Sequence, residues 1–159
     1  FRKYGITDQL DKLLQRKVWL KSGGYLVIDV TEALTVIDVN TGKYTGEVDL
    51  EHTVFETNME AAAEIARLLR LRDIGGMVII DFIDMEEEAH RDMVMHTLEQ
   101  CLKNDRTKAQ VVGWTKLGLL ELTRKKVRQN LQDLFLVPCP ECKGLGRVAS
   151  ASLPDLSSW

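Results

Sequence analysis

The stretch Gly23–Asn40, GGYLVIDVTEALTVIDVN, decides the fold. It contains two runs rich in β-branched residues, Tyr25–Val30 and Leu34–Asn40, and only three residues separate them. β-Branched side chains fit the pleated surface of a sheet, and so short a connection joins neighbouring antiparallel strands. The sequence therefore predicts a tight antiparallel strand pair, followed by a turn at residues 40–43.

Helices and further strands are expected after this pair. Asn58 can cap a helix whose residues are mostly Ala, Leu, Glu and Arg, all good helix formers. The continuous apolar run Met77–Ile83 is typical of a strand that is covered on both faces. This alternation of strands and helices predicts an α/β fold, a mixed sheet flanked by helices. The expected helices are 60–72 and 86–102, and the further expected strands are 77–83, 109–113 and 119–122.

The two ends of the chain depart from this pattern. Apolar residues from Ile6 to Val18 are spaced as one helical stripe, so residues 1–22 are expected to form an N-terminal helix or connector. Beyond Pro138 the apolar periodicity ends, and Pro, Cys and Gly dominate. We therefore expect a principal subdomain over residues 23–137, a short cysteine-containing segment over 138–148 and a tail over 149–159.

Composition narrows the class of protein. The 159 residues include 21 Lys and Arg against 24 Asp and Glu, a net charge of −3. This balance argues against a protein that coats nucleic acid by bulk charge, but it leaves room for a local basic groove beside an acidic metal site. No stretch approaches the roughly 18 apolar residues of a membrane helix, and no signal peptide opens the chain. A cytoplasmic protein without a membrane span is expected.

Three aspartates lie inside apolar strand runs. Asp29 and Asp38 each stand in a VIDV sequence, and Asp81 stands in IIDF. A carboxylate in such surroundings is costly to ionise unless it is paired or binds a cation. Strand periodicity places Asp38 and Asn40 on one face, and Asp81 joins them if its strand lies alongside. These oxygen donors suit a hard cation such as Mg²⁺.

A structural role is the alternative for these aspartates. Each could pair with an arginine or cap a helix, and Arg67, Arg70 and Arg72 are available. Asp84 precedes an expected helix and is interpreted as a turn or cap residue, and His90 is interpreted as a helix-surface residue.

Cys139 and Cys142 form a C-x-x-C pair followed by Gly144 and Gly146, which is typical of a zinc knuckle. Structural zinc normally takes four ligands, and this chain offers only these two in a suitable setting. Two copies of the pair, one from each of two chains, would complete the site, so the pattern predicts a zinc-bridged homodimer. A redox dithiol and an incidental pair are the alternatives. Cys101 is expected to be a small buried residue.

A basic cluster includes Arg124, Lys125 and Lys126. Positive charge at this point could hold the phosphates of a polynucleotide. Such a run is more often the solvated face of a helix, which is the alternative here.

Four ordered blocks of the chain closely resemble the catalytic core of the ribonuclease E/G family. They are Gly23–Gly42, Asn58–Met85, Thr115–Lys126 and the C-P-E-C-x-G-x-G segment, which matches the family's zinc link. The resemblance that these blocks carry extends over nearly the whole chain. The sequence departs from the family pattern at Leu69, Trp114 and Lys126, where tolerated changes or altered packing are expected.

The resemblance implies an endoribonuclease that cleaves single-stranded RNA in RNA processing, including rRNA processing, and in decay, leaving a 5′-phosphate and a 3′-hydroxyl. It places the Mg²⁺ ligands on Asp38 and Asp81, with Asn40 supporting the site, in a subdomain described as DNase I-like. It also implies that Cys139 and Cys142 bind one Zn²⁺ together with a partner chain.

Family enzymes also carry an S1 RNA-binding module and a pocket for the RNA 5′-monophosphate, both upstream of the matching region. Their absence here leads us to expect that the chain is a fragment. An alternative function follows, in which this part of the enzyme is a zinc-bridged dimerisation scaffold with no activity on its own.

Overall fold

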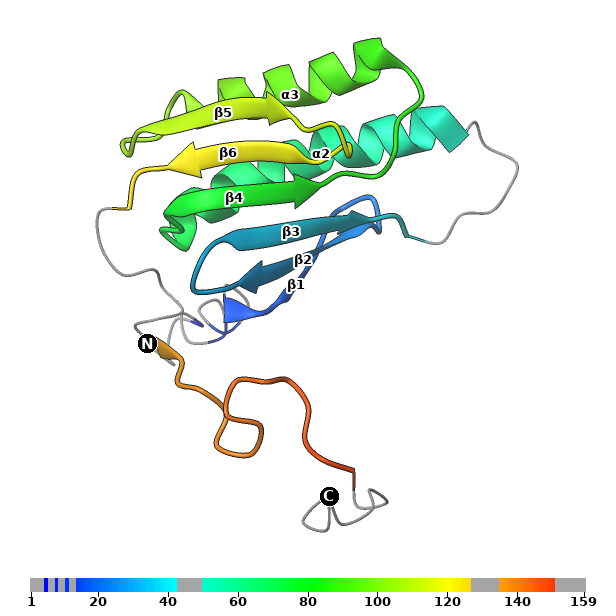
Figure 1. Ribbon diagram of the computed structural model, residues 1–159. Coiled ribbons are helices and arrows are strands. Elements are labelled where there is room, and N and C mark those ends of the chain that lie inside the picture. The colour runs from blue at the N-terminus through cyan, green and yellow to red at the C-terminus, as the bar shows by residue number, and fades with distance from the viewer. Residues whose placement is uncertain are drawn as a thin grey trace.

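A six-stranded mixed sheet with two helices makes up most of the computed structural model, which describes residues 14–42, 50–126 and 135–150, together with Gly5, Asp8 and Asp11. The expected α/β class is therefore confirmed (Figure 1). The elements are β1 (Lys17–Trp19), β2 (Tyr25–Val30), β3 (Thr35–Asn40), α2 (Leu50–Leu71), β4 (Gly76–Asp81), α3 (Glu88–Leu102), β5 (Ala109–Trp114) and β6 (Leu120–Arg124).

The strands lie in the order β1-β2-β3-β4-β6-β5. Strands β2 and β3 form the predicted antiparallel pair, and the Thr31 N–H closes their turn by donating to the Leu34 carbonyl at 2.9 Å. The pair β3–β4 is parallel, while the other neighbours are antiparallel. Parallel neighbours need a long crossover connection, and α2 provides it. The carboxyl ends of β3 and β4 consequently meet at one edge of the sheet.

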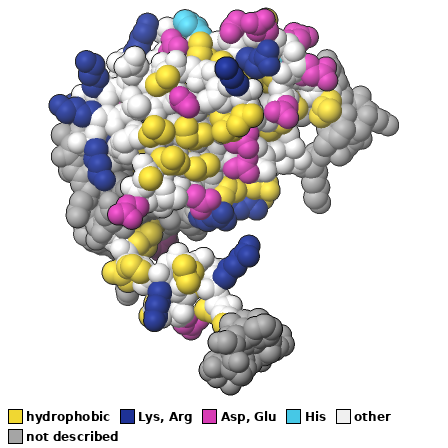
Figure 2. Space-filling model, viewed as in Figure 1, with side chains coloured by type: hydrophobic (Ala, Val, Ile, Leu, Met, Phe, Trp, Pro, Cys, Tyr) yellow, Lys and Arg dark blue, Asp and Glu magenta, His cyan; other side chains and the backbone are white. Residues whose placement is uncertain are grey.

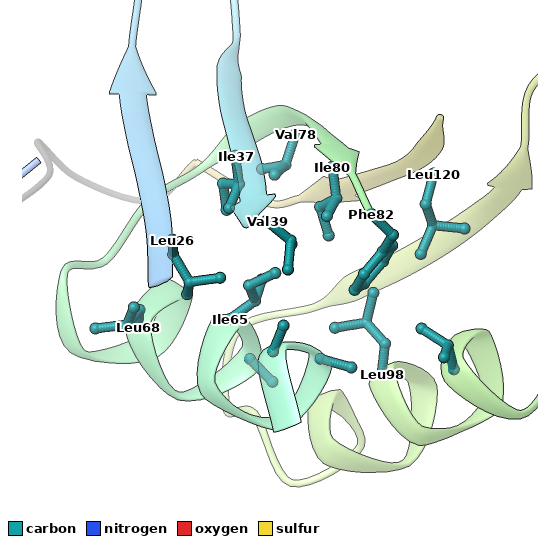
Figure 3. Close-up of a cluster of buried hydrophobic side chains, with 14 of the residues drawn as sticks. Leu26, Ile37, Val39, Ile65, Leu68, Val78, Ile80, Phe82, Leu98 and Leu120 are labelled. Atoms are coloured by element: carbon teal, nitrogen blue, oxygen red, sulfur yellow. The ribbon is translucent and has the colours of Figure 1, made fainter. Parts of the chain in front are cut away.

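The core lies between one face of the sheet and the two helices (Figure 3). Alternate residues of each strand point to this face, and each fully buried Val, Leu or Ile contributes about 1.5–3 kcal/mol relative to exposure. The face contributes Leu26, Ile28, Ile37, Val39, Val78, Ile80, Leu120 and Leu122, and the helices contribute Ile65, Leu68, Leu69, Val94 and Leu98. We call this side of the sheet the covered face.

The opposite side of the sheet, the uncovered face, carries no helix among the described residues. On β4, Met77 is 46% exposed while its neighbour Val78 is 0% exposed. The expectation that this strand is covered on both faces was therefore wrong. Its apolar run does place hydrophobic side chains on both sides, but the described helices, α2 and α3, pack against one side. Figure 2 shows apolar and acidic side chains gathered over this uncovered face.

Two other expectations need correction. Helix α2 begins at Leu50, so Asn58 lies inside the helix, where it is 0% exposed, and it does not cap the helix end. Val18 lies in β1 opposite Leu26 and not on a helix, because pairing with the edge of the sheet overrides the local apolar spacing. No helix in the described ranges is long and apolar enough to cross a membrane.

Candidate active site

Asp38 and Asp81 are direct register partners on the parallel strands β3 and β4. Both alternate with buried core residues, so both side chains lie on the uncovered face. Neighbouring strands are about 4.8 Å apart, which brings the two carboxylates side by side. Asn40 stands two residues beyond Asp38 on the same face, and its Nδ2 donates to the Asp38 Oδ2 at 3.3 Å. The three side chains that the sequence singled out thus form one cluster.

The cluster concentrates negative charge. Partial burial, together with the nearby carboxylates of Asp38 and Asp84, raises the pKa of Asp81 above its usual value. Neither Asp38 nor Asp81 forms an ion pair with another residue in the described ranges. Like charges held together without a cationic partner cost free energy, which a bound cation would recover. Asp84, interpreted from sequence as a turn or cap residue, adds its charge to this cluster.

The arginines proposed as structural partners bind elsewhere. Arg67 donates to Glu64 at 2.6 Å, Arg70 donates to the Cys101 carbonyl at 3.0 Å, and Arg72 donates to the Gln15 carbonyl at 2.8 Å.

The structural alternative does describe Asp29. Arg16 donates to both of its carboxylate oxygens, at 2.5 and 3.0 Å, and this hydrogen bonding lowers the pKa of Asp29. The three aspartates in strand runs therefore separate into one salt-bridged residue and two that face one another.

The loop after β4 is held by a residue whose position the sequence analysis misread. The Asn58 Nδ2 donates to the Ile83 carbonyl at 2.8 Å, and the Ile83 N–H donates to the Asn58 Oδ1 at 3.1 Å. This reciprocal pair fixes the backbone between Asp81 and Asp84. The signal was present in the sequence, because Asn58 is an amide on the same helix face as the apolar Ala61, Ala62 and Ile65.

The donor set fits magnesium. No group of three His, Cys, Asp or Glu side chains suited to a metal gathers within 14–42, 50–126 and 135–150. Magnesium does not need such a cage, since it usually keeps several waters and takes one or two carboxylates plus substrate phosphates. Asp38 and Asp81 supply two carboxylates on rigid strands, and the surface position leaves room for water and phosphate.

The three residues of the basic cluster differ in exposure, because Arg124 is buried while Lys125 and Lys126 are exposed. Arg124 is 4% exposed and donates to Asp105 at 2.8 Å, to Asp73 at 2.9 Å and to the Ile74 carbonyl at 3.2 Å. Buried and fully engaged in this way, Arg124 cannot reach a polynucleotide phosphate, so that expectation is withdrawn for this residue.

Lys125 and Lys126 are exposed, and they follow a strand, not a helix. The two lysines follow Arg124, which pairs with Gly76 at the beginning of β4. Asp81 stands at the other end of β4. Five residues of strand span about 16 Å, so these lysines are distant from the acidic cluster.

The cysteine segment adopts a turn that surrounds one sulfur with backbone donors. The Lys143 N–H donates to the Cys139 carbonyl at 2.7 Å, and the glycines at 144 and 146 have φ of 88° and 75°. Hydrogen bonds from the N–H groups of Gly146 and Gly144, followed by one with Cys139, lower the pKa of Cys142. The thiolate is the form of cysteine that binds metals, and the two sulfurs of this turn equal half of the four ligands that a tetrahedral zinc site takes.

His90 is not an open helix-surface residue. Its Nδ1 lies 2.8 Å from the Glu51 Oε1, and its ring stacks on Phe55 with centroids 4.2 Å apart. Glu51 also accepts the N–H groups of Glu86 and Glu87, so the contact joins the start of α2 to the start of α3.

Comparison with known proteins shows the family to which the chain belongs. The model of the ribonuclease E/G family matches residues 1–127. The chain is 50% identical to "Ribonuclease G" of Salmonella typhimurium over 148 residues, which is 93% of this chain and 30% of that protein. It is 48% identical to "Ribonuclease E" of Synechocystis, covering 91% of this chain and 22% of that protein. The chain belongs to the ribonuclease E/G family, and it spans less than a third of these relatives.

Proposed function

We propose that this chain carries the catalytic aspartates of a magnesium-dependent endoribonuclease that hydrolyses single-stranded RNA. The observation that carries the proposal is the pairing of Asp38 with Asp81 across parallel strands, without a cationic partner among the described residues. Membership of the ribonuclease E/G family supports RNA as the substrate. The proposed setting is RNA processing and decay in the cytoplasm.

The residues have separate tasks in the proposed reaction. The paired carboxylates of Asp38 and Asp81 would hold the cation, and Asn40 orients the Asp38 carboxylate through its hydrogen bond. Magnesium bound at this point would polarise the phosphate and lower the pKa of a coordinated water. Water adds to phosphorus, the bond from phosphorus to the 3′ oxygen breaks, and a proton passes to that oxygen. The products are a 5′-phosphate and a 3′-hydroxyl.

Replacement of the paired aspartates tests this assignment. Asp38→Asn and Asp81→Asn should each lower the cleavage rate about 10³-fold, since metal ions contribute several kcal/mol of transition-state stabilisation. The free energy of unfolding should stay unchanged or rise, because a like-charge repulsion is removed. The assay follows a labelled single-stranded RNA in Mg²⁺, with EDTA as a parallel sample.

Asp29→Asn is the matched control, because Asp29 lies on the same face but is paired with Arg16. It should leave the cleavage rate within a factor of two or so of wild type, in keeping with the small energies of exposed ion pairs. Full cleavage by either Asp38→Asn or Asp81→Asn would defeat the assignment.

A zinc-bridged homodimer is the second part of the proposal. Cys139 and Cys142 of two chains would together supply four thiolates to one Zn²⁺, which is the usual composition of a closed structural site. Metal analysis should then find one zinc for every two chains, and sedimentation should show monomers after chelation or in Cys139→Ser. A chain that stays dimeric under both conditions contradicts the shared site.

The alternative function is a scaffold without turnover of its own. The observation that favours it is the cysteine turn, because a zinc site shared by Cys139 and Cys142 of two chains would join the chains whether or not they cleave RNA. Cleavage of single-stranded RNA by the isolated chain in Mg²⁺, lost in EDTA and in Asp81→Asn, would exclude this alternative.

A further inference from the structure

A cation and two aromatic rings lie in line with the acidic cluster on the uncovered face. In the register of the sheet, Trp19 on β1 pairs with Tyr25 on β2, and Tyr25 pairs with Asn40 on β3. At about 4.8 Å per strand, Tyr25 is about 5 Å and Trp19 about 10 Å from the Asn40 position. The row therefore runs directly outward from the proposed catalytic site.

The neighbouring row contains Lys17, Val27, Asp38 and Asp81 in that order. Lys17 is thus the basic residue of the row that holds both aspartates. It stands at the active end of the sheet, unlike Lys125 and Lys126 at the opposite end of β4.

The three side chains form one cluster. The Trp19 and Tyr25 ring centroids are 5.3 Å apart with planes inclined at 57°. The Lys17 Nζ lies 4.3 Å from the Trp19 centroid and 4.1 Å from the Tyr25 centroid, which is cation–π geometry. Trp19 nevertheless remains 64% exposed. A large aromatic ring left open to this extent, and braced by its neighbours, is available to a ligand.

We propose that Trp19, Tyr25 and Lys17 bind one nucleotide of single-stranded RNA next to the bond that is cleaved. The proposal rests on the function proposed above and adds a positioning site to it. Every base has a π-face, so stacking on Trp19 or Tyr25 recognises single strands with little dependence on sequence. Lys17 supplies a positive charge for a backbone phosphate on a face otherwise marked by Asp29, Asp38 and Asp81. Base-paired RNA is excluded from such stacking because its bases are already stacked on each other.

Binding to a non-cleaved strand tests the cluster separately from catalysis. In the intact protein, with Asp81→Asn and EDTA to stop cleavage, Trp19→Ala should raise the Kd for a labelled single-stranded RNA about tenfold. Lys17→Met should raise it less and should make binding less sensitive to salt. Trp19→Phe keeps a stacking face and should restore most of the affinity. Val112→Ala, another exposed apolar side chain but on the far edge strand β5, is the control and should bind as well as the parent.

Two further measurements locate the contact in protein with both aspartates intact. Trp19→Ala should raise KM for single-stranded RNA while kcat changes little. An RNA with 4-thiouridine beside the cleaved bond should crosslink to the peptide that contains Trp19 or Tyr25.

Unchanged Kd and KM in Trp19→Ala, or crosslinks confined to other peptides, would overturn the proposal that this cluster binds RNA. So would an altered oligomeric state in Trp19→Ala with unaltered RNA binding, because that result assigns the rings to a contact between chains. The proposed function fails by a different result, full cleavage by Asp81→Asn, so the two failures are distinguishable.

Discussion

Polar side chains on the covered and uncovered faces of the same sheet differ in whether they have protein partners. On the covered side, the Asn58 amide is satisfied by both backbone groups of Ile83, and Arg124 by two aspartates and a carbonyl. On the uncovered side, Asp38 and Asp81 face each other with no ion pair to any described residue. An unpartnered polar group is costly when buried, so most buried polar groups have protein partners, whereas a water-exposed site can keep charges for a ligand. These carboxylates are therefore the basis for placing the proposed site on the uncovered face.

The largest stability effect should come from the covered face. Arg124→Met leaves the Asp105 carboxylate, whose side chain is 3% exposed, buried without its partner. Breaking a buried ion pair on one side typically costs about 3–5 kcal/mol of the free energy of unfolding. Urea denaturation should show this loss, while the exposed Lys125→Met stays within about 0.5 kcal/mol. Equal losses in the two variants would mean that Arg124 is not a structural residue.

Adjacent residues of β4 provide a second comparison of the faces. Ile80 is 0% exposed under the helices, and Ile79 is half-buried on the uncovered face. Ile80→Ala should cost about 2–5 kcal/mol through lost burial and a residual cavity, and Ile79→Ala less than half as much. Chemical denaturation of both variants measures the difference. A cost for Ile79→Ala equal to that of Ile80→Ala would show that something covers this face.

The smallest expected effect concerns pH and the contact between the two helices. The hydrogen bond with His90, followed by those from the Glu86 and Glu87 N–H groups, lowers the pKa of Glu51 below its usual value of 4.5. Ionised Glu51 therefore stabilises the fold fully above about pH 4.5, and this contribution is lost as the pH falls through the lower folded-state pKa.

Urea midpoints of wild type and Glu51→Gln measure this contribution. The wild type should be the more stable at pH 7, and the difference should shrink at pH 3. A difference of constant size across this range would show that ionisation of Glu51 does not matter to stability.

Local pattern was enough for most elements and for the members of the acidic cluster. Alternating β-branched runs with a three-residue connection predicted the β2–β3 pair because side-chain period and turn length are local properties. Asp38 and Asn40 on one face followed from the same period. The start of α2 was missed by ten residues, and Asn58 was taken for a cap, because an asparagine at a helix end and one that clamps a distant loop look alike in sequence.

The sequence by itself determined the α/β class and the family to which the chain belongs, and it singled out the aspartates and the cysteine pair as candidate metal ligands. Only the tertiary structure decided which charges are free. It paired Asp29 with Arg16, buried Arg124 between Asp73 and Asp105, and left Asp38 beside Asp81. It also aligned Trp19 and Tyr25 with Asn40, across strands that a sequence does not order. The physical reason is that residue type fixes what a side chain can bind, while burial and strand register fix which partners it meets.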